Sequence, residues 1–201
     1  MDGVLYEVTR DFLEKDAEVI FDVNRYEEYT QAAHCAIYSL SDKKVLSKYS
    51  AKANVLMVMR FDGTLGFPGG GIPEGENIVD GLSRELKEEI NFDTDKYQFC
   101  KENYILTIVN HQAKYCFHFF WLRMLPDEYY ETEKRALLAE DYGDETYGIL
   151  RVPLYTFNSS QGFPSFLQNN FIENAKFQLL YFLGKEKILP IDELTEAIRN
   201  A

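Results

Sequence analysis

Residues 65–92 read LGFPGGGIPEGENIVDGLSRELKEEINF, and this stretch decides the fold. Its first half holds five glycines and two prolines, which predict a structured loop without a regular element. From Asn77 the pattern becomes helical, because the Asn77 side chain can cap the free amides of a helix start. Asn91 tolerates the left-handed conformation, so we expect the helix to end there. The apolar residues that recur at helical spacing are Ile78, Leu82, Leu86 and Ile90.

Three acidic side chains crowd one face of this predicted helix. Glu85, Glu88 and Glu89 stand at positions i, i+3 and i+4, and like charges so placed destabilise a bare helix by roughly 0.2–0.5 kcal/mol per pair. A cation must therefore compensate them. Mg2+ or Mn2+ is the natural candidate, because both take oxygen ligands and bridge carboxylates to phosphates.

Two further features support a built site at this helix. The glycines let the backbone approach closely, so a carbonyl of Gly69 or Gly70 could add a ligand that no side chain could reach. Arg84, with Glu76 upstream, offers an ion pair that would tie the loop to the helix. An isolated run of charges is usually a solvated helix face. Seven specified positions over twenty residues, behind a loop rich in glycine and proline, instead favour a functional motif.

The rest of the chain predicts one domain, residues 1–201, because no repeat or flexible linker divides it. The first thirty residues suggest a short helix and a loop outside the core. The fold class is α+β, with a mixed sheet sandwiched between α-helices. Strands are expected at 34–40, 52–61, 97–110, 114–125 and 147–154, with a hairpin at 111–113, and helices from Pro126, at 166–183 and at 191–200.

Composition bounds the class of protein. The chain has 201 residues, of which 46% are hydrophobic, so intrinsic disorder is excluded. The net charge of −12 excludes a globally basic nucleic-acid binder. A local basic patch is compatible with it, since Lys43, Lys44, Lys48 and Lys52 fall within ten residues; they could guide RNA phosphates or simply form a solvated turn. The three cysteines lack metal-ligand spacing and predict reduced thiols in an intracellular protein, and no membrane span or secretion signal is recognised.

Residues 70–92 resemble the Nudix box, G-x5-E-x7-R-E-L-x-E-E, of hydrolases that act on nucleoside diphosphates linked to another moiety. The phrases VLMVMRFDGTLGFPGG, RVPLYT and FPSFLQNNFIENAKFQLL extend the resemblance to the subfamily of small-nucleolar-RNA-decapping enzymes and inosine diphosphatases, over roughly residues 34–183. Asn91 departs from the family, which usually has glycine there. Because asparagine also suits a helix end, we expect activity to survive.

The resemblance implies roles for particular residues. Glu85, Glu88 and Glu89 would be catalytic and would bind Mg2+ or Mn2+ together with a carbonyl of Gly69 or Gly70. Arg60 would meet the substrate phosphate, His34 and Phe67 would line the purine site, and Gln178 would read a base edge. Each of the last three also has a structural interpretation, as a buried histidine, a packed loop residue and a solvent-facing glutamine. Glu145 is a weaker candidate for a further carboxylate, and polar positions in strands are the better interpretation of His111 and His118.

The implied function is metal-dependent hydrolysis of phosphoanhydride bonds, with removal of RNA caps and conversion of (deoxy)inosine diphosphate to the monophosphate. Two alternatives remain: a Nudix pyrophosphatase for ADP-ribose or dinucleotide-type caps, and a non-catalytic RNA-binding scaffold. Retention of all three glutamates argues against the scaffold. The resemblance also implies a homodimer, for which the exposed strand edges and the apolar run at 117–125 could furnish an interface, and a nuclear location, with the cytoplasm equally compatible.

Overall fold

The computed structural model describes residues 3–201 and contains a mixed β-sheet with helices on both faces. The sheet follows the order β1-β8-β9-β2-β5-β10, with β6 paired to β5 and β7 paired to β2. Strands β2 and β9 run parallel and the other pairs antiparallel, so the predicted mixed sheet is confirmed. The strands are β1 (Ala17–Ile20), β2 (Thr30–Leu40), β5 (Ala53–Arg60), β6 (Leu65–Gly66), β7 (Gly69–Ile72), β8 (Tyr104–Asn110), β9 (Tyr115–Arg123) and β10 (Thr146–Arg151).

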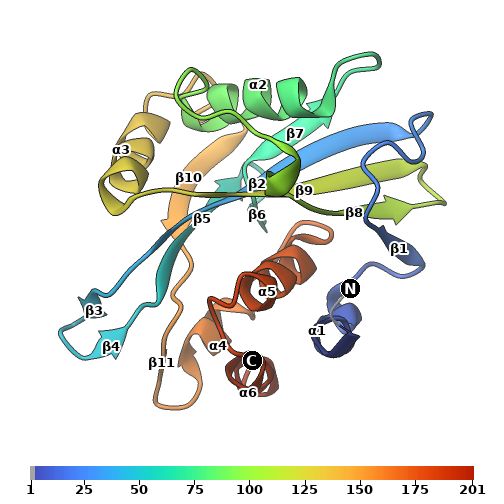
Figure 1. The fold of residues 1–201 in the computed structure, drawn as a ribbon. Coiled ribbons are helices and arrows are strands. Elements are labelled where there is room, and N and C mark those ends of the chain that lie inside the picture. The colour runs from blue at the N-terminus through green and yellow to red at the C-terminus, as the bar shows by residue number, and fades with distance from the viewer. Residues whose placement is uncertain (1–2) are drawn as a thin grey trace.

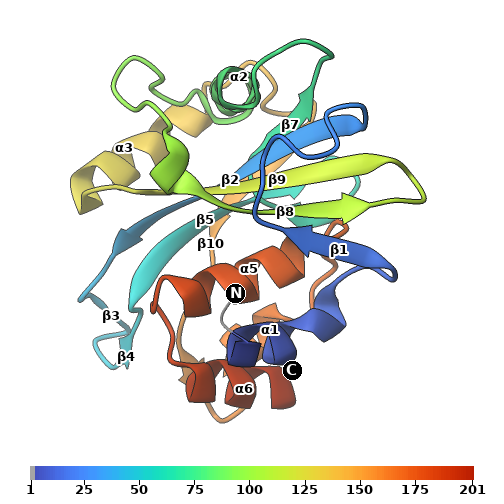
Figure 2. The ribbon, with the colours of Figure 1, turned by 45° about the vertical axis from the view of Figure 1, so that its right-hand side comes forward.

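Two hydrophobic clusters, one on each face of the sheet, hold the helices (Figures 1 and 2). Helices α2 (Ile78–Ile90) and α3 (Pro126–Ala136) pack on one face. The other face carries α1 (Gly3–Thr9), α4 (Phe163–Phe166), α5 (Ala175–Lys185) and α6 (Ile191–Arg199). The short elements are η1 (Arg10–Phe12), η2 (Lys101–Asn103), and the hairpins β3 (Lys44–Val45) with β4 (Tyr49–Ser50) and β11 (Thr156–Phe157) with β12 (Gln161–Gly162).

Helix α2 forms as the sequence predicts. The Asn77 side chain accepts hydrogen bonds from the amides of Val79 and Asp80, and so caps the first turn. Asn91 adopts φ 49°, the left-handed conformation expected at the end. The apolar face formed by Leu82, Leu86 and Ile90 is fully buried, which fixes the acidic face relative to the sheet.

The prediction of a loop without regular structure at residues 65–77 was wrong, because β6 and β7 lie within it. Strand β7 pairs antiparallel with residues 31–34 of β2. At Gly69 the φ angle is 131°, and a Cβ atom would lie 2.1 Å from the carbonyl oxygen of Ala33. Only glycine permits this close approach, so here the glycine run enables strand pairing.

Three other expectations need correction. The N-terminal segment contributes an edge strand, since β1 pairs with β8. Strand β8 begins only at Tyr104, after the short helix η2. The helix predicted at 166–183 is broken between α4 and α5, because backbone hydrogen bonds from Leu65 to Asn170 (2.8 Å) and from Ile172 to Leu65 (3.0 Å) hold this segment against β6. Within residues 3–201, no helix is long and apolar enough to cross a membrane.

Candidate active site

A cavity of about 340 Å3 lies where β2, β7 and β9 meet the start of α5 and the acidic face of α2. Nearly all of the predicted site residues line it, although they come from six separate parts of the chain. Glu88 is the exception and does not line the cavity. The predicted residues in the lining are His34, Arg60, Phe67, Gly69, Gly70, Glu85, Glu89, Glu145 and Gln178.

Arg84 organises the carboxylates of the α2 region. Its guanidinium contacts Glu76 (3.0 Å), Glu85 (2.7 Å) and Glu88 (2.9 Å), and it donates to the carbonyl of Gly71 (3.2 Å). The predicted tie between loop and helix is therefore present. Because one arginine spans the three acids, Glu85 and Glu88 are held in place rather than left to repel each other.

Glu89 is the most deeply placed of the three glutamates, with 3% of its surface exposed. Its carboxylate accepts a hydrogen bond of 2.9 Å from the backbone amide of Gly69. Burial, reinforced by the charges of Glu85 and Glu145, raises the pKa of Glu89 to about 8. A buried carboxylate with acidic neighbours is a group that a nearby cation would stabilise in its charged form.

The donor set fits a hard divalent cation, since it combines carboxylates with backbone carbonyls beside glycines. Gly70 shapes this set, because a Cβ atom there would lie 2.2 Å from Oε2 of Glu85. Within residues 3–201 no three His, Cys, Asp or Glu side chains form a preassembled cluster, and Arg84 occupies oxygens of both Glu85 and Glu88. Glu89, Glu85 and the adjacent backbone are the groups that would hold the ion.

Arg60 and His34 supply further polar groups to the cavity lining. The Nε atom of Arg60 is buried without a hydrogen-bond partner, and its nearest acidic contact is Asp62 at 3.8 Å. Nδ1 of His34 is likewise buried and unpartnered. Burial and the positive charge of Arg60 lower the pKa of His34 to about 4, so the imidazole is neutral at neutral pH. The guanidinium of Arg60 can donate to a bound molecule, and the neutral imidazole of His34 can donate or accept according to its tautomer.

Gln178 departs from its structural alternative, a solvent-facing glutamine, whereas Phe67 agrees with its own, a packed residue. Gln178 is buried on α5 and lines the cavity, which rules out a solvent-facing position. Phe67 is only 2% exposed and packs against Phe119 at 5.0 Å between ring centroids. Its ring therefore contributes mainly to the core and offers little surface to a stacked base.

Sequence reasoning missed a second part of the cavity. Tyr115 and Phe117 of β9 stack with ring centroids 4.7 Å apart, and both line the cavity with Glu173 and Asn174. The alternation of Tyr115 and Phe117 places both rings on one face of the strand, and this period of two was the available signal. No local pattern indicated Glu173.

The other histidines have structural contacts. His118, on β9, is fully buried between Thr107 (2.7 Å to Nδ1) and Gln31 (2.7 Å to Nε2). Gln31 donates both amide hydrogens to backbone carbonyls, so its oxygen accepts from Nε2–H of His118. His111 lies in the turn after β8 rather than in a strand, and contacts Glu18 at 2.8 Å.

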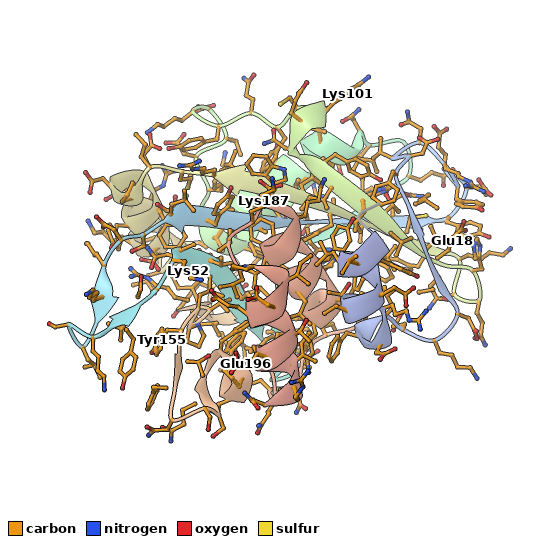
Figure 3. The ribbon with its side chains drawn as sticks, turned by 60° about the horizontal axis from the view of Figure 1, so that its bottom comes forward. Glu18, Lys52, Lys101, Tyr155, Lys187 and Glu196 are labelled. Atoms are coloured by element: carbon orange, nitrogen blue, oxygen red, sulfur yellow. The ribbon has the colours of Figure 1, made fainter. Side chains whose placement is uncertain are left out.

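The lysine-rich segment lies apart from the cavity lining, around the β3–β4 hairpin. Lys43 donates to the hydroxyl of Tyr130, Lys48 lies over the Tyr49 ring, and Lys52 pairs with Glu193 of α6. In Figure 3, Lys52 and Tyr155 lie toward one side of the molecule and Glu18 toward the other. In the apolar run at 117–125, residues 117–120 and Met124 are buried, Trp121 and Leu122 are half-buried, and Arg123 and Leu125 are exposed.

Comparison with known proteins agrees with this geometry. Residues 31–189 match the family described as Nudt16-like, U8 snoRNA-decapping enzyme-like. The chain belongs to this family. A U8 snoRNA-decapping enzyme from Homalodisca vitripennis is 44% identical over 79% of this chain and 85% of the relative. The corresponding enzyme of Xenopus laevis is 36% identical, over 86% of this chain and 83% of the relative.

One further relative and one solved structure also resemble this chain. The Tudor-interacting repair regulator protein of Mus musculus is 30% identical over 86% of this chain and 82% of its own length. A MutT/nudix family protein from Enterococcus faecalis shares the fold with a TM-score of 0.50 and 12% identity; the match covers 82% of this chain and just under two thirds, 64%, of that one. This member of the family has the predicted Nudix fold and is a Nudix pyrophosphohydrolase.

Proposed function

We propose that the protein is a metal-dependent hydrolase that removes caps from RNA and converts (deoxy)inosine diphosphate to the monophosphate. The observation that carries the proposal is the single cavity in which Glu85 and Glu89 face Arg60, His34 and Gln178. Acidic groups for a cation, a cationic group for phosphate and polar groups for a base thus share one space. The names of the relatives from Homalodisca vitripennis and Xenopus laevis support RNA decapping.

The chain's own residues have distinct tasks in this proposal. Arg60 lines the cavity, and its guanidinium binds a phosphate oxygen through charge-assisted hydrogen bonds. Arg84 and the amide of Gly69 fix the carboxylates of Glu85 and Glu89. A carboxylate of the cavity accepts the proton of the attacking water, and Glu85, Glu89 and Glu145 are its candidates. Bound Mg2+ or Mn2+ would lower the pKa of water and neutralise phosphate charge.

The reaction adds water across a phosphoanhydride bond. A free nucleoside diphosphate gives the monophosphate and inorganic phosphate, whereas a capped RNA releases its cap as a nucleoside diphosphate. The test is turnover of inosine diphosphate, guanosine diphosphate, ADP-ribose and a short capped RNA with Mg2+ or Mn2+, for the wild type and Glu89→Gln. We expect the wild type to cleave inosine diphosphate and capped RNA. In the variant kcat should fall at least 100-fold, because the removal of a group that acts in the transition state costs ~10²-fold or more.

Two alternative functions give different results in the same assay. Cleavage of ADP-ribose or of a dinucleotide cap alone would indicate a pyrophosphatase for those compounds. Absence of metal-dependent turnover with an intact fold would indicate a binding scaffold, which the relationship to the Tudor-interacting repair regulator protein makes worth testing. The intact set of glutamates favours the enzyme.

The proposal includes a cellular setting and an assembly. A nuclear location is proposed by analogy with snoRNA decapping, and a cytoplasmic share is compatible with it. A homodimer is proposed as well; light scattering of the purified protein tests it. The lysines of the β3–β4 hairpin are proposed to guide RNA phosphates toward the cavity, so their replacement should weaken turnover of capped RNA and spare inosine diphosphate.

A further inference from the structure

A carboxylate stands at the mouth of the cavity without a partner that would explain it. Glu173 lines the cavity just before α5, and its backbone adopts φ 41°. This left-handed conformation favours glycine or asparagine, so a glutamate there carries a steric cost. Among the described residues, 3–201, its carboxylate forms no hydrogen bond or ion pair. Glu173 therefore places a free carboxylate in the cavity at the cost of backbone strain.

Glu173 lines the same cavity as Arg60 but comes from the segment just before α5, whereas the proposed metal ligands come from α2 and β7. Arg60 acts electrostatically on both Glu89 and Glu173, and opposes the rise in the pKa of each carboxyl. The acidic neighbour that acts on Glu173 is Glu14, whereas Glu85 and Glu145 act on Glu89. A carboxylate in that segment would repel phosphate. It therefore faces the part of a nucleotide that carries hydrogen-bond donors, which is the base.

An aromatic surface stands beside this carboxylate. Tyr115 lines the cavity together with Glu173, and desolvation and the charge of Glu173 both raise the pKa of the Tyr115 hydroxyl. Tyr115 is partly exposed and stacks on Phe117. Gln178 lies in the same lining with its amide unbonded within residues 3–201. A flat ring, a carboxylate and an amide are the groups that bind a purine by stacking and by edge recognition.

The chemistry of the base edges selects among purines. Guanine presents two adjacent donors, N1–H and the N2 amino group, which match the two oxygens of one carboxylate. Hypoxanthine lacks the N2 amino group and offers one donor. Adenine places an acceptor at N1, which repels a carboxylate. We propose that Glu173, beside Tyr115, is a specificity residue that makes the cavity prefer guanine nucleotides to hypoxanthine nucleotides.

This inference rests on the proposed function and deepens it. The experiment compares guanosine and inosine diphosphates as substrates, through kcat/KM, for the wild type and Glu173→Gln. The charge-assisted pair predicts a guanine preference of about tenfold or more in the wild type, since such a hydrogen bond is worth roughly a tenfold factor. Glu173→Gln should reduce this ratio toward one, mainly by lowering kcat/KM for guanosine diphosphate. The control is Glu18→Gln, which removes an acidic charge outside the cavity lining, where the carboxylate contacts His111 and Tyr26, and it should keep the wild-type ratio.

A binding measurement separates the two proposals. Calorimetric titration with guanosine and inosine monophosphates tests base preference even where no turnover occurs. If the wild type hydrolyses neither diphosphate but binds the guanine nucleotide more tightly, and Glu173→Gln abolishes that preference, the proposed function fails and this inference stands. An unchanged ratio in Glu173→Gln would overturn the inference. So would an equal loss on both substrates, because that indicates a role at the phosphates or in the fold.

Discussion

Replacement of Gly70 by alanine should damage the candidate site while sparing the fold. The added Cβ would lie 2.2 Å from Oε2 of Glu85, and ordinary contact begins at 3.4 Å. The carboxylate must therefore retreat by 3.4 − 2.2, or about 1.2 Å, against the hold of Arg84 at 2.7 Å. Misplacement of a catalytic group by ~1 Å can cost ~10²-fold in rate, so we expect kcat/KM to fall about 100-fold. This corresponds to about 2.7 kcal/mol of transition-state stabilisation.

The same strand provides the control. A Cβ at Gly71 meets nothing within 4 Å, and neither glycine has a φ angle in the left-handed region. Gly71→Ala should therefore keep wild-type turnover of inosine diphosphate, and both variants should unfold within about 1 kcal/mol of the wild type. Steady-state kinetics and urea unfolding measure the two properties. Equal kcat/KM values for the two alanine variants would refute the reasoning that the Glu85 position beside Gly70 matters for catalysis.

Two other perturbations test the surroundings of the site. Arg84→Lys keeps one positive charge but cannot span three carboxylates, so kcat/KM should fall about tenfold. The melting temperature should change little, because such part-exposed ion pairs contribute only ~0–1 kcal/mol each. A variant with unaltered kinetics would contradict this. Burial lowers the pKa of His118 from 6.5 to about 4. Below pH 6.5 the unfolded chain therefore binds a proton that the folded chain does not, and the free energy of unfolding decreases as the pH is lowered. Between pH 7.5 and 5 this amounts to ~2 kcal/mol, and urea unfolding of His118→Gln should show a correspondingly smaller loss; equal losses would argue against it.

Local signals explain what the sequence predicts well. Helix α2 is predicted from its capping residue to its end because Asn77, the apolar spacing and Asn91 all act within one or two turns. Strand β7 is not, since the conformation of Gly69 is decided by its pairing with β2, about thirty-five residues away in the chain. Likewise the break before α5 depends on hydrogen bonds from Leu65 to the segment near Asn170, which no helical periodicity reveals.

The same distinction holds for the site. The glutamates of α2 are visible in the sequence because a single helix presents them at fixed spacing. Tyr115 and Glu173 are not visible, because they share a cavity only after β9 and the start of α5 are brought together across the sheet. Phe67 shows the converse: the family resemblance implies a ring that lines the purine site, yet its packing against Phe119 removes that ring from solvent.

The charges of the cavity limit the form in which a substrate can enter. Within the described residues, four glutamates line the cavity and Arg60 is the one lysine or arginine in the lining. The whole chain carries a net charge of −12, so its field also opposes an approaching phosphate. A nucleotide accompanied by a divalent cation avoids most of this repulsion, because the cation offsets both the phosphates and the carboxylates of Glu85 and Glu89. The proposed metal dependence therefore reconciles the acidic composition of this protein with phosphate chemistry.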